Sequence, residues 1–352
     1  MLGVATAAAC HAAGLGRVLL IEAGRLASGA SGGAAGLLIP EAHQGNDPQP
    51  LTDLARISLD RWRQLDAAAP LGLRDHDWLA LAPHPDPFLA DPSPAVQWLD
   101  TTEVERLIPG LTPPTTGALI PHQARVNPVR ALLGLAARVP QIATGCPATA
   151  VTIKHGRIHT VTTPAGGLTP GAVVFATGLP PRIPGLPIDL PASTVKGHLV
   201  ATEPVPVTLP GTVTQLATQI EDHRLLAGGT LDTGDPTTEV NPEVTGRIRA
   251  GIAAALPQLG NVRLTHRWCC WRPRHPDGLA VIDRVPGLAN AWLTSGHYRT
   301  GILMAPATAD ALARWIATGQ PSAGLEPWQI KERFNSCTVA TEPTQVPRPS
   351  DH

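Results

Sequence analysis

Residues 1–22 constrain the fold more than any other part of the chain. Residues 4–13 are mostly alanine and predict a helix that ends at Gly14. A short aliphatic run over residues 17–22 then predicts a buried parallel strand that ends in Glu22. A helix, a glycine and a strand ending in an acid form the second half of a Rossmann βαβ unit, in which the acid accepts hydrogen bonds from an adenosine ribose. We therefore expect an α/β fold with a nucleotide near Glu22.

The first half of this unit has no counterpart in the sequence. Gly3 fits only the third glycine of the G-x-G-x-x-G motif, and the strand and two glycines that should precede it are missing. We favour a misplaced translation start, because the remaining pieces of the motif are intact. The alternative is a true truncation, which would weaken or abolish nucleotide binding. Reading the genomic frame upstream of Met1 distinguishes the two.

The loop after Glu22 is unusually rich in small residues. The small residues of this loop include Ser28, Ser31, Gly32, Ala35 and Gly36. Small residues let backbone amides approach a pyrophosphate or a flavin ring that larger side chains would block. A flexible linker is the other interpretation. However, the loop continues directly into the apolar residues 37–40, which argues for a fixed, packed position.

A second glycine-rich turn lies near the C-terminus, at residues 295–301, and carries Arg299. The apolar, alanine-rich run after it predicts a helix from Ile302 to about Thr318. Unpaired backbone N–H groups at a helix N-terminus suit negative charge, and we expect the amides of residues 300–303 to be placed for this role. An arginine in such a turn could bind a carboxylate in bidentate fashion.

The bulk composition excludes several classes of function. The 352-residue chain carries a formal net charge of −1, so no general attraction to nucleic acid or anionic membranes is implied. Its 5 cysteines lack CxxC spacing, so we expect neither a disulfide framework nor a metal site. No apolar run is long enough for a membrane-spanning segment, and no secretory signal is recognised. We expect a cytoplasmic protein, and a homo-oligomer is compatible with the sequence.

Glu22, the loop of residues 28–36 and the segment of residues 296–309 together resemble the FAD-dependent D-amino-acid-oxidase superfamily. The run Gly-His-Tyr-Arg-x-Gly-Ile-Leu-x-Ala-Pro-Ala-Thr most resembles the glycine oxidases of thiamine biosynthesis. The resemblance extends from Gly3 to about Trp328. It implies a Rossmann-like FAD-binding domain, lacking its first strand, and a substrate domain with an antiparallel sheet.

The same resemblance implies the domain boundaries. The FAD-binding domain comprises residues 1–45, 122–182 and 278–330, and the substrate-binding domain comprises residues 46–121 and 183–277. Residues 331–352 are rich in Pro, Thr and Ser with few large apolar side chains, and we expect a disordered tail.

The cofactor implied by the resemblance is non-covalently bound FAD. The positions that match its binding residues are Gly3, Glu22, Ser28, Ser31, Gly32, Ala35, Gly36, Val151, Thr177, Gly178, Gly296, Thr300, Gly301, Ile302 and Leu303. The backbone near Val151 is expected to hold the adenine. Thr177-Gly178 ends an apolar strand and is expected beside the FAD, although a tight strand exit is an equal explanation. Cys270 falls close to a covalent flavin attachment point of sarcosine-oxidase relatives, but we interpret it as a buried structural thiol.

Two arginines match residues that border the substrate in the glycine oxidases. We expect Arg272, in Trp271-Arg272-Pro273, to bind the substrate carboxylate, with Arg299 beside it. No catalytic acid or base is expected, because the flavin takes hydride from the α-carbon. The family also carries a tyrosine near the carboxylate, and the matching place here falls near Leu216. The substrate therefore stays open.

The resulting hypothesis is an enzyme that oxidises glycine or a small amino acid to an imine, then to a keto acid and ammonia, with O2 giving H2O2. A D-amino-acid or N-methyl-amino-acid (sarcosine-type) dehydrogenase or oxidase, which could use an electron carrier, is the alternative within the same fold. An inactive, FAD-free remnant is the alternative from another class.

Overall fold

The computed structural model describes residues 1–44, 47–82, 96–235 and 237–334. The helices are α1 (Leu2–Ala12), α2 (Gln49–Ala68), α3 (Thr101–Leu107), α4 (Pro128–Ala136), α5 (Pro242–Ala255), α6 (Ala305–Thr318) and α7 (Ile330–Arg333). Short 3-10 turns lie at Pro40–His43, Glu221–His223, Pro257–Leu259 and Glu326–Trp328.

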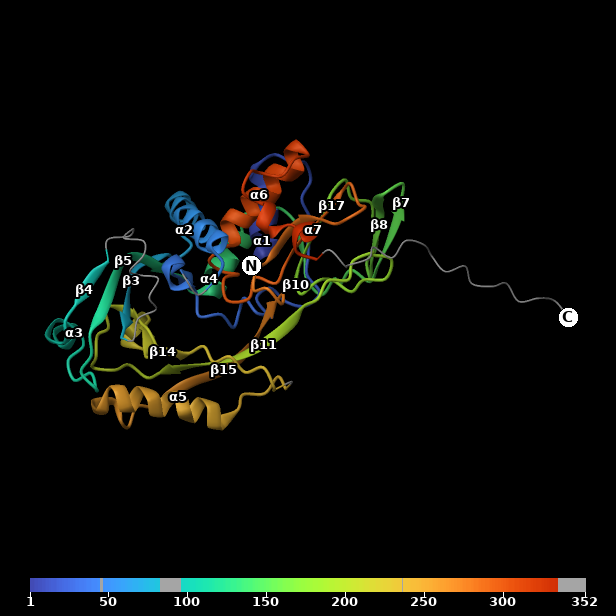
Figure 1. Ribbon diagram of the computed structural model, residues 1–352. Helices are drawn as coiled ribbons and strands as arrows, with labels where there is room; N and C mark the ends of the chain where they lie inside the picture. The colour runs from blue at the N-terminus through green and yellow to red at the C-terminus, as the bar shows by residue number, and fades with distance from the viewer. Residues whose placement is uncertain (45–46, 83–95, 236, 335–352) are drawn as a thin grey trace.

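Parallel strands form the part of the molecule around α1 and α6. β1 (Leu20–Ile21) pairs in parallel with β6 (Ile142–Ala143). β10 (Val173–Gly178) pairs in parallel with β17 (Ala291–Ser295), whose other neighbour is the antiparallel β16 (Val281–Arg284). A separate antiparallel sheet contains β7 (Ala150–Lys154), β8 (Arg157–Thr163) and β9 (Gly166–Leu168). It lies at the opposite end of the molecule from α3 (Figure 1).

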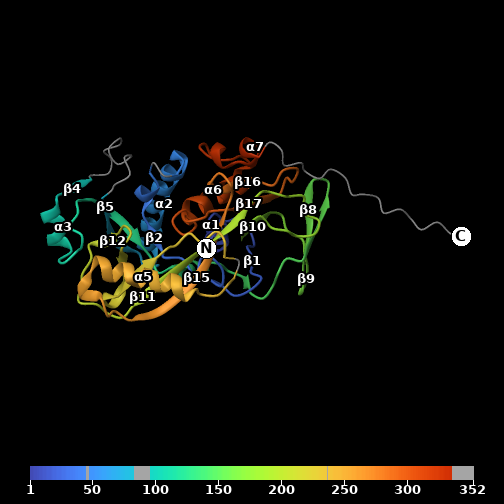
Figure 2. The same ribbon diagram turned by 60° about the horizontal axis from the view of Figure 1, so that its bottom comes forward.

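A large curled sheet forms the other part. Within the described residues its order is β15 (Leu264–Arg274), β11 (Ser193–Thr202), β14 (Leu225–Gly228), β13 (Ala217–Gln219), β12 (Gly211–Val213), β3 (Arg74–Leu81), β5 (Gly117–Arg125) and β2 (Leu37–Leu38), with β4 (Gln97–Leu99) also on β5. Neighbouring strands are antiparallel except β12 and β3. Helix α5 runs alongside β11 and β15 in both views (Figure 1 and Figure 2). The expected α/β fold with a largely antiparallel second sheet is confirmed.

Local sequence signals explain where several helices begin. Asp100 and Glu103 form a reciprocal capping box at α3. Asn127 and Asn241 accept hydrogen bonds from the first amides of α4 and α5, and each is followed by a proline at the first helical position.

Four features differ from the prediction. The strand predicted over residues 17–22 is reduced to Leu20–Ile21, because its partner β6 is only two residues long. Helix α6 begins at Ala305 rather than Ile302, since the preceding residues form a separate turn. Strands β12 and β13 were not predicted. The predicted domain boundaries stay a prediction.

The fourth difference concerns the C-terminal segment. Residues 331–333 belong to α7 instead of a disordered tail. The fork of Arg333 binds both carboxylate oxygens of Asp277 at 2.7 Å, which fixes this segment. The rest of the predicted tail, residues 335–352, lies outside the described residues. In the described parts of the chain, no helix combines the length and the apolar character that a bilayer crossing requires.

Candidate functional site

The carboxyl ends of the parallel strands β10 and β17 meet at two of the predicted glycines. Gly178 lies opposite Ser295 in the register, and the amide of Gly296 donates to the carbonyl of Gly178 at 2.8 Å. A Cβ on Gly296 would collide with the ring of His275, so this position requires glycine. The predicted Thr177-Gly178 exit and the second glycine-rich turn therefore adjoin at the edge where α/β sheets bind ligands.

The turn of residues 297–304 presents three free backbone amides. The amide of Thr300 donates to the carbonyl of His297 and that of Met304 to the carbonyl of Thr300, both at 2.8 Å. Among the described residues, the amides of Gly301, Ile302 and Leu303 have no backbone acceptor. They lie just ahead of α6, so the positive end of the helix adds to their attraction for negative charge. Thr300, predicted to contribute an amide, has its own amide engaged.

Two side chains of helix α2 are hydrogen-bonded to this turn and to the first turn of α6. Trp62 is fully buried, and its indole N–H donates to the carbonyls of Ile302 and Leu303 at 3.1 Å. The hydroxyl of Ser58 accepts from the amide of Ala307 at 3.2 Å, in the first turn of α6. Engaging the carbonyls fixes the orientation of the peptide groups. Trp62 was not singled out from the sequence.

Glu22 lies at the end of β1, where the sequence predicted it. Its amide donates to Ala143 and its carbonyl accepts from Cys146, both at 2.9 Å, while its carboxylate accepts from Gly24 at 2.8 Å. Gly3 of α1 packs close to β1 and β10, since an added Cβ would lie 3.4 Å from the Cβ of Ala176. This close approach of a helix to two strands is the role of the third glycine in a dinucleotide motif.

The backbone amide of Val151 and the hydroxyl of Thr177, both from predicted cofactor residues, are engaged in hydrogen bonds within the chain. The amide of Val151 already donates to the carbonyl of Pro184 at 2.9 Å, and the hydroxyl of Thr177 donates to Leu179 at 2.7 Å. Residues 143–146 lie directly beside Glu22 through the hydrogen bonds above, and sequence reasoning missed them. The parallel pairing of β1 with β6 is the signal that would have found them.

The small-residue loop is packed against the rest of the chain. A Cβ on Gly32 would collide with the carbonyl oxygen of Ala27, and a Cβ on Gly36 would collide with the carbonyl oxygen of Val126. Gly36 also has a φ of +78°, which favours glycine. Gly33 lies against Cys270 of β15, whose thiol contacts the Gly33 carbonyl at 3.3 Å. The linker interpretation is thereby excluded for this part of the loop. Ser31 accepts a hydrogen bond from the Met1 amine at 2.9 Å, Ala35 is half-buried and Ser28 is exposed.

Arg272 lies near the end of β15 and is half-buried. One arm of its guanidinium, Nη1, donates to the carbonyl of Thr230 at 2.8 Å. The guanidinium lies over Gly197 of β11, where any side chain would collide with it. Burial raises the pKa of the Cys270 thiol although the positive charge of Arg272 opposes this. A protonated thiol is a poor nucleophile, which supports non-covalent cofactor binding.

Arg299 already has a carboxylate partner within the chain. Its Nη2 lies 2.8 Å from Oδ2 of Asp47, which also accepts from Nδ1 of His43 at 2.7 Å. Burial opposes ionisation of Asp47, but these two partners hold its pKa below the ordinary value. The Tyr298 ring lies between Arg274 and Arg299, 5.3 and 5.5 Å from their guanidinium carbons. Arg274 is half-buried.

His297 is a buried polar group that sequence reasoning did not single out. Burial lowers the pKa of its imidazole to about 3, so the ring is neutral. Its Nε2 is hydrogen-bonded to the hydroxyl of Thr294 at 2.7 Å, and within the described residues its Nδ1 has no partner. An unpartnered buried nitrogen next to the free amides suits a polar group of a bound cofactor.

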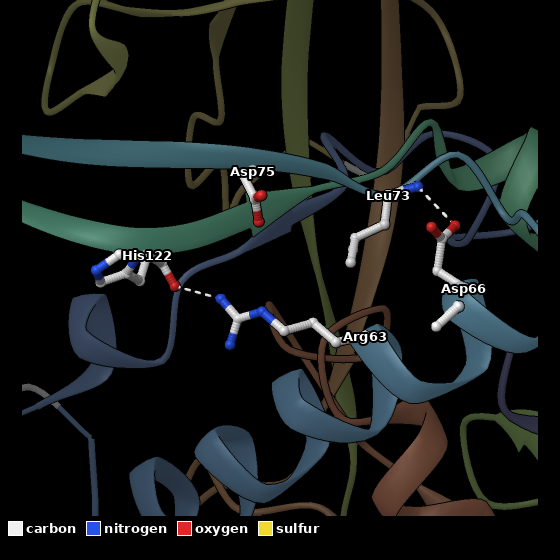
Figure 3. A pocket seen from close by; sticks show the side chains of 6 residues that line it. Arg63, Asp66, Leu73, Asp75 and His122 are labelled. Carbon is white, nitrogen blue, oxygen red and sulfur yellow. Dashed lines mark hydrogen bonds between the residues drawn. The ribbon is translucent and has the colours of Figure 1, made fainter.

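A surface depression is lined by residues of α2, β3 and β5 and of the turn before β3 (Figure 3). Two of its charged side chains have partners within the chain, because Arg63 donates to the carbonyl of His122 at 2.6 Å and Asp66 accepts from the amide of Leu73 at 3.0 Å. None of the predicted cofactor or substrate residues lines it.

A family model described as FAD dependent oxidoreductase (DAO) matches residues 1–315. The chain belongs to this family. It is 28% identical to the glycine oxidase of Pseudomonas aeruginosa, over 91% of this chain and 93% of that protein. It is also 28% identical to the ThiO oxidoreductase of Rhizobium etli, which is named for thiamine biosynthesis, over 87% of this chain and 91% of that protein. The crystal structure of glycine oxidase from Geobacillus kaustophilus has the same fold, with a TM-score of 0.81 and 24% identity, over 93% of this chain and 96% of that one.

The residues present fit the FAD of this family. Glu22 is an acceptor at the end of β1 for a ribose, the amides of residues 301–303 are free donors, and the adjacent Nδ1 of His297 is unpartnered. Glu22 follows β1, which pairs in parallel with β6, and residues 296–303 follow β17, which pairs in parallel with β10. Within the described residues, these groups of residues 3–36 and 296–303 would hold the FAD.

Proposed function

We propose that this oxidoreductase converts glycine or another small amino acid to an imine, which water hydrolyses to a keto acid and ammonia. In this proposal O2 takes the two electrons and two protons and becomes H2O2. One observation carries it: residues 270–273 of β15 contact three predicted cofactor segments. Cys270 contacts Gly33 at 3.3 Å, Pro273 lies 3.5 Å from a Cβ placed on Gly178, and the Pro273 carbonyl accepts from Tyr298 at 2.7 Å. Arg272 lies between these contacts.

Arg272 orients the substrate in this reaction. Thr230 engages one nitrogen of its guanidinium, and the remaining N–H groups face a carboxylate as charge-assisted donors. FAD, when bound, accepts a hydride from the substrate α-carbon. The amides of Gly301, Ile302 and Leu303 stabilise negative charge at the electron-rich edge of the cofactor. Solvent deprotonates the substrate amine, so no general base from the chain is required.

The similarity to the Rhizobium etli ThiO protein supports a more specific role. We propose that the imine product supplies the synthesis of the thiamine thiazole ring. The pairing of Arg299 with Asp47 leaves Arg272 as the arginine of the two without a carboxylate partner among the described residues. This arrangement favours a substrate with a single carboxylate, as glycine has.

The test uses the full chain purified with FAD. Under anaerobic conditions, glycine, sarcosine and D-alanine are added in turn and the flavin absorbance is followed. We expect bleaching by glycine and peroxide release when oxygen is admitted. Bleaching without peroxide would favour a dehydrogenase that passes electrons to a carrier. The proposal is wrong if none of these amines bleaches the flavin, or if the chain retains no flavin.

A further inference from the structure

The loop of residues 229–241, of which residue 236 lies outside the described residues, follows β14 and contacts the strand that carries Arg272. Two side chains from β11, Lys196 and His198, reach into this loop, and both residues are 0% exposed. Neither has a role in the proposed reaction. A buried ammonium and a buried imidazole are costly unless they are fully hydrogen-bonded, so their presence calls for an explanation.

His198 is hydrogen-bonded to Asp232 and Asn241, which both belong to this loop. Its Nε2 accepts from the amide of Asn241 at 3.0 Å, so the ring proton is on Nδ1, which donates to Oδ2 of Asp232 at 2.8 Å. The same Oδ2 accepts from the hydroxyl of Thr230 at 2.7 Å. That hydroxyl in turn accepts from the amide of His198 at 2.9 Å. Thr230, Asp232 and His198 therefore form a closed ring of hydrogen bonds.

Lys196 anchors the second half of the loop. Its ammonium donates to Asp235 at 2.7 Å, to the hydroxyl of Thr237 at 3.0 Å and to the carbonyl of Glu239 at 2.6 Å. Its backbone also exchanges two hydrogen bonds with Asp232, at 3.1 and 2.8 Å. With all three ammonium protons used, the lysine is fully satisfied, and the loop is fixed to β11 at both ends.

Thr230 connects this ring of hydrogen bonds to Arg272 through its backbone carbonyl. The carbonyl of Thr230 accepts from Nη1 of Arg272 at 2.8 Å, while Gly197 leaves room for the guanidinium beside it. We propose that Asp232, acting through Thr230 and His198, is a positioning residue that fixes the guanidinium of Arg272 in the orientation needed to bind the substrate carboxylate. This inference rests on the proposed function for its consequence, but the contact itself can be tested separately.

The first experiment measures the freedom of Arg272 without using activity. Phenylglyoxal modifies arginines, and peptide mass mapping follows the rate at Arg272 in the full chain. We expect Asp232→Ala and Thr230→Val each to speed modification of Arg272 about fivefold, because both remove hydrogen bonds that fix Thr230, whose carbonyl holds the Arg272 guanidinium. Asp189→Ala, at an exposed position, is the matched control and should leave the rate unchanged. Unchanged reactivity of Arg272 in both test variants overturns the inference.

The second experiment is a double-mutant cycle on carboxylate binding. Acetate is titrated into the FAD-loaded protein, and the flavin spectrum reports binding. We expect Asp232→Ala to weaken acetate binding about tenfold in the parent chain and to have no further effect in the Arg272→Gln background. An equal loss in both backgrounds would mean that Asp232 acts through general loop stability, which overturns the inference.

These outcomes separate the inference from the proposed function. If no amino acid bleaches the flavin but Asp232→Ala still frees Arg272, the proposed function fails and the positioning role stands. If glycine is oxidised but Arg272 reacts equally in all variants, the positioning role fails and the proposed function stands. A change in KM with kcat preserved in Thr230→Val would agree with misplaced carboxylate binding, since a cofactor defect would lower kcat.

Discussion

Nη2 of Arg299 lies 2.8 Å from Oδ2 of Asp47, 252 residues away in sequence. This ion pair connects the segment after the small-residue loop to the glycine-rich turn before α6. It also means that Arg299, which was expected beside the substrate, is paired with a carboxylate of the chain itself.

The Asp47–Arg299 pair should make stability depend on acid pH. The pKa of Asp47 is held below its ordinary value, so the pair contributes stability at neutral pH that is lost as the pH falls below about 4. Asp47→Asn should lower the free energy of unfolding at pH 7 by less than about 1 kcal/mol, because the arginine is partly exposed. Urea unfolding at pH 7 and pH 3 checks this. The deficit should be smaller at pH 3 than at pH 7, and an equal deficit at both values would contradict the prediction.

The two arginines should differ in their effect on the substrate. Arg272→Ala removes a charge-assisted contact worth about 1.5–3 kcal/mol, so the apparent affinity for glycine should fall about tenfold or more without unfolding the protein. Arg299→Ala should change it less than about threefold, because Asp47 already occupies that side chain. Initial rates over a range of glycine concentrations measure both. Equal losses in the two variants would require a different carboxylate site.

Trp62 should matter to the cofactor although it lies behind the turn. Trp62→Phe removes the indole N–H that binds the carbonyls of Ile302 and Leu303, and two buried carbonyls then lose a partner. We expect about 1–3 kcal/mol less stability and a lower FAD content after gel filtration. Trp98→Phe, at an exposed position, is the control for loss of a tryptophan. Full FAD retention in Trp62→Phe would show that the turn does not depend on this support.

The small-residue loop offers a matched pair of glycines. Gly36 has φ +78° and faces the carbonyl of Val126, whereas a Cβ on Gly29 meets no atom within 4 Å. Gly36→Ala should therefore destabilise the protein by about 1–3 kcal/mol, and Gly29→Ala should stay within about 0.5 kcal/mol of the parent. Thermal unfolding of both variants measures the difference. Similar melting temperatures would mean that the loop adapts to a side chain.

Local sequence signals predicted much of the fold. The helix before Gly14 and the apolar strand ending at Gly178 depend on neighbouring residues, so the sequence records them directly. The turn that separates Gly301 from α6 was missed because residues 302–304 are as apolar as the helix that follows.

The candidate site was predicted only in part. Arg272, Glu22 and the glycines follow from their motifs, but their partners are set by contacts between distant segments. Nothing near Thr230 in the sequence indicates that its carbonyl holds Arg272, and nothing near Asp47 indicates that it pairs with Arg299. Such pairings depend on strand order and register, which a single sequence without an alignment does not encode locally.

Neighbouring residues of strand β15 make contacts with different segments of the chain. Cys270 and Arg272 contact the small-residue loop and Thr230, while the alternate residue Cys269 contacts the carbonyl of Thr238. Because successive side chains point to opposite faces, inserting or deleting one residue between Leu264 and Arg272 would turn Arg272 to the wrong face. Active homologues should therefore differ in the lengths of the loops around β15 but align through residues 264–274 without a gap.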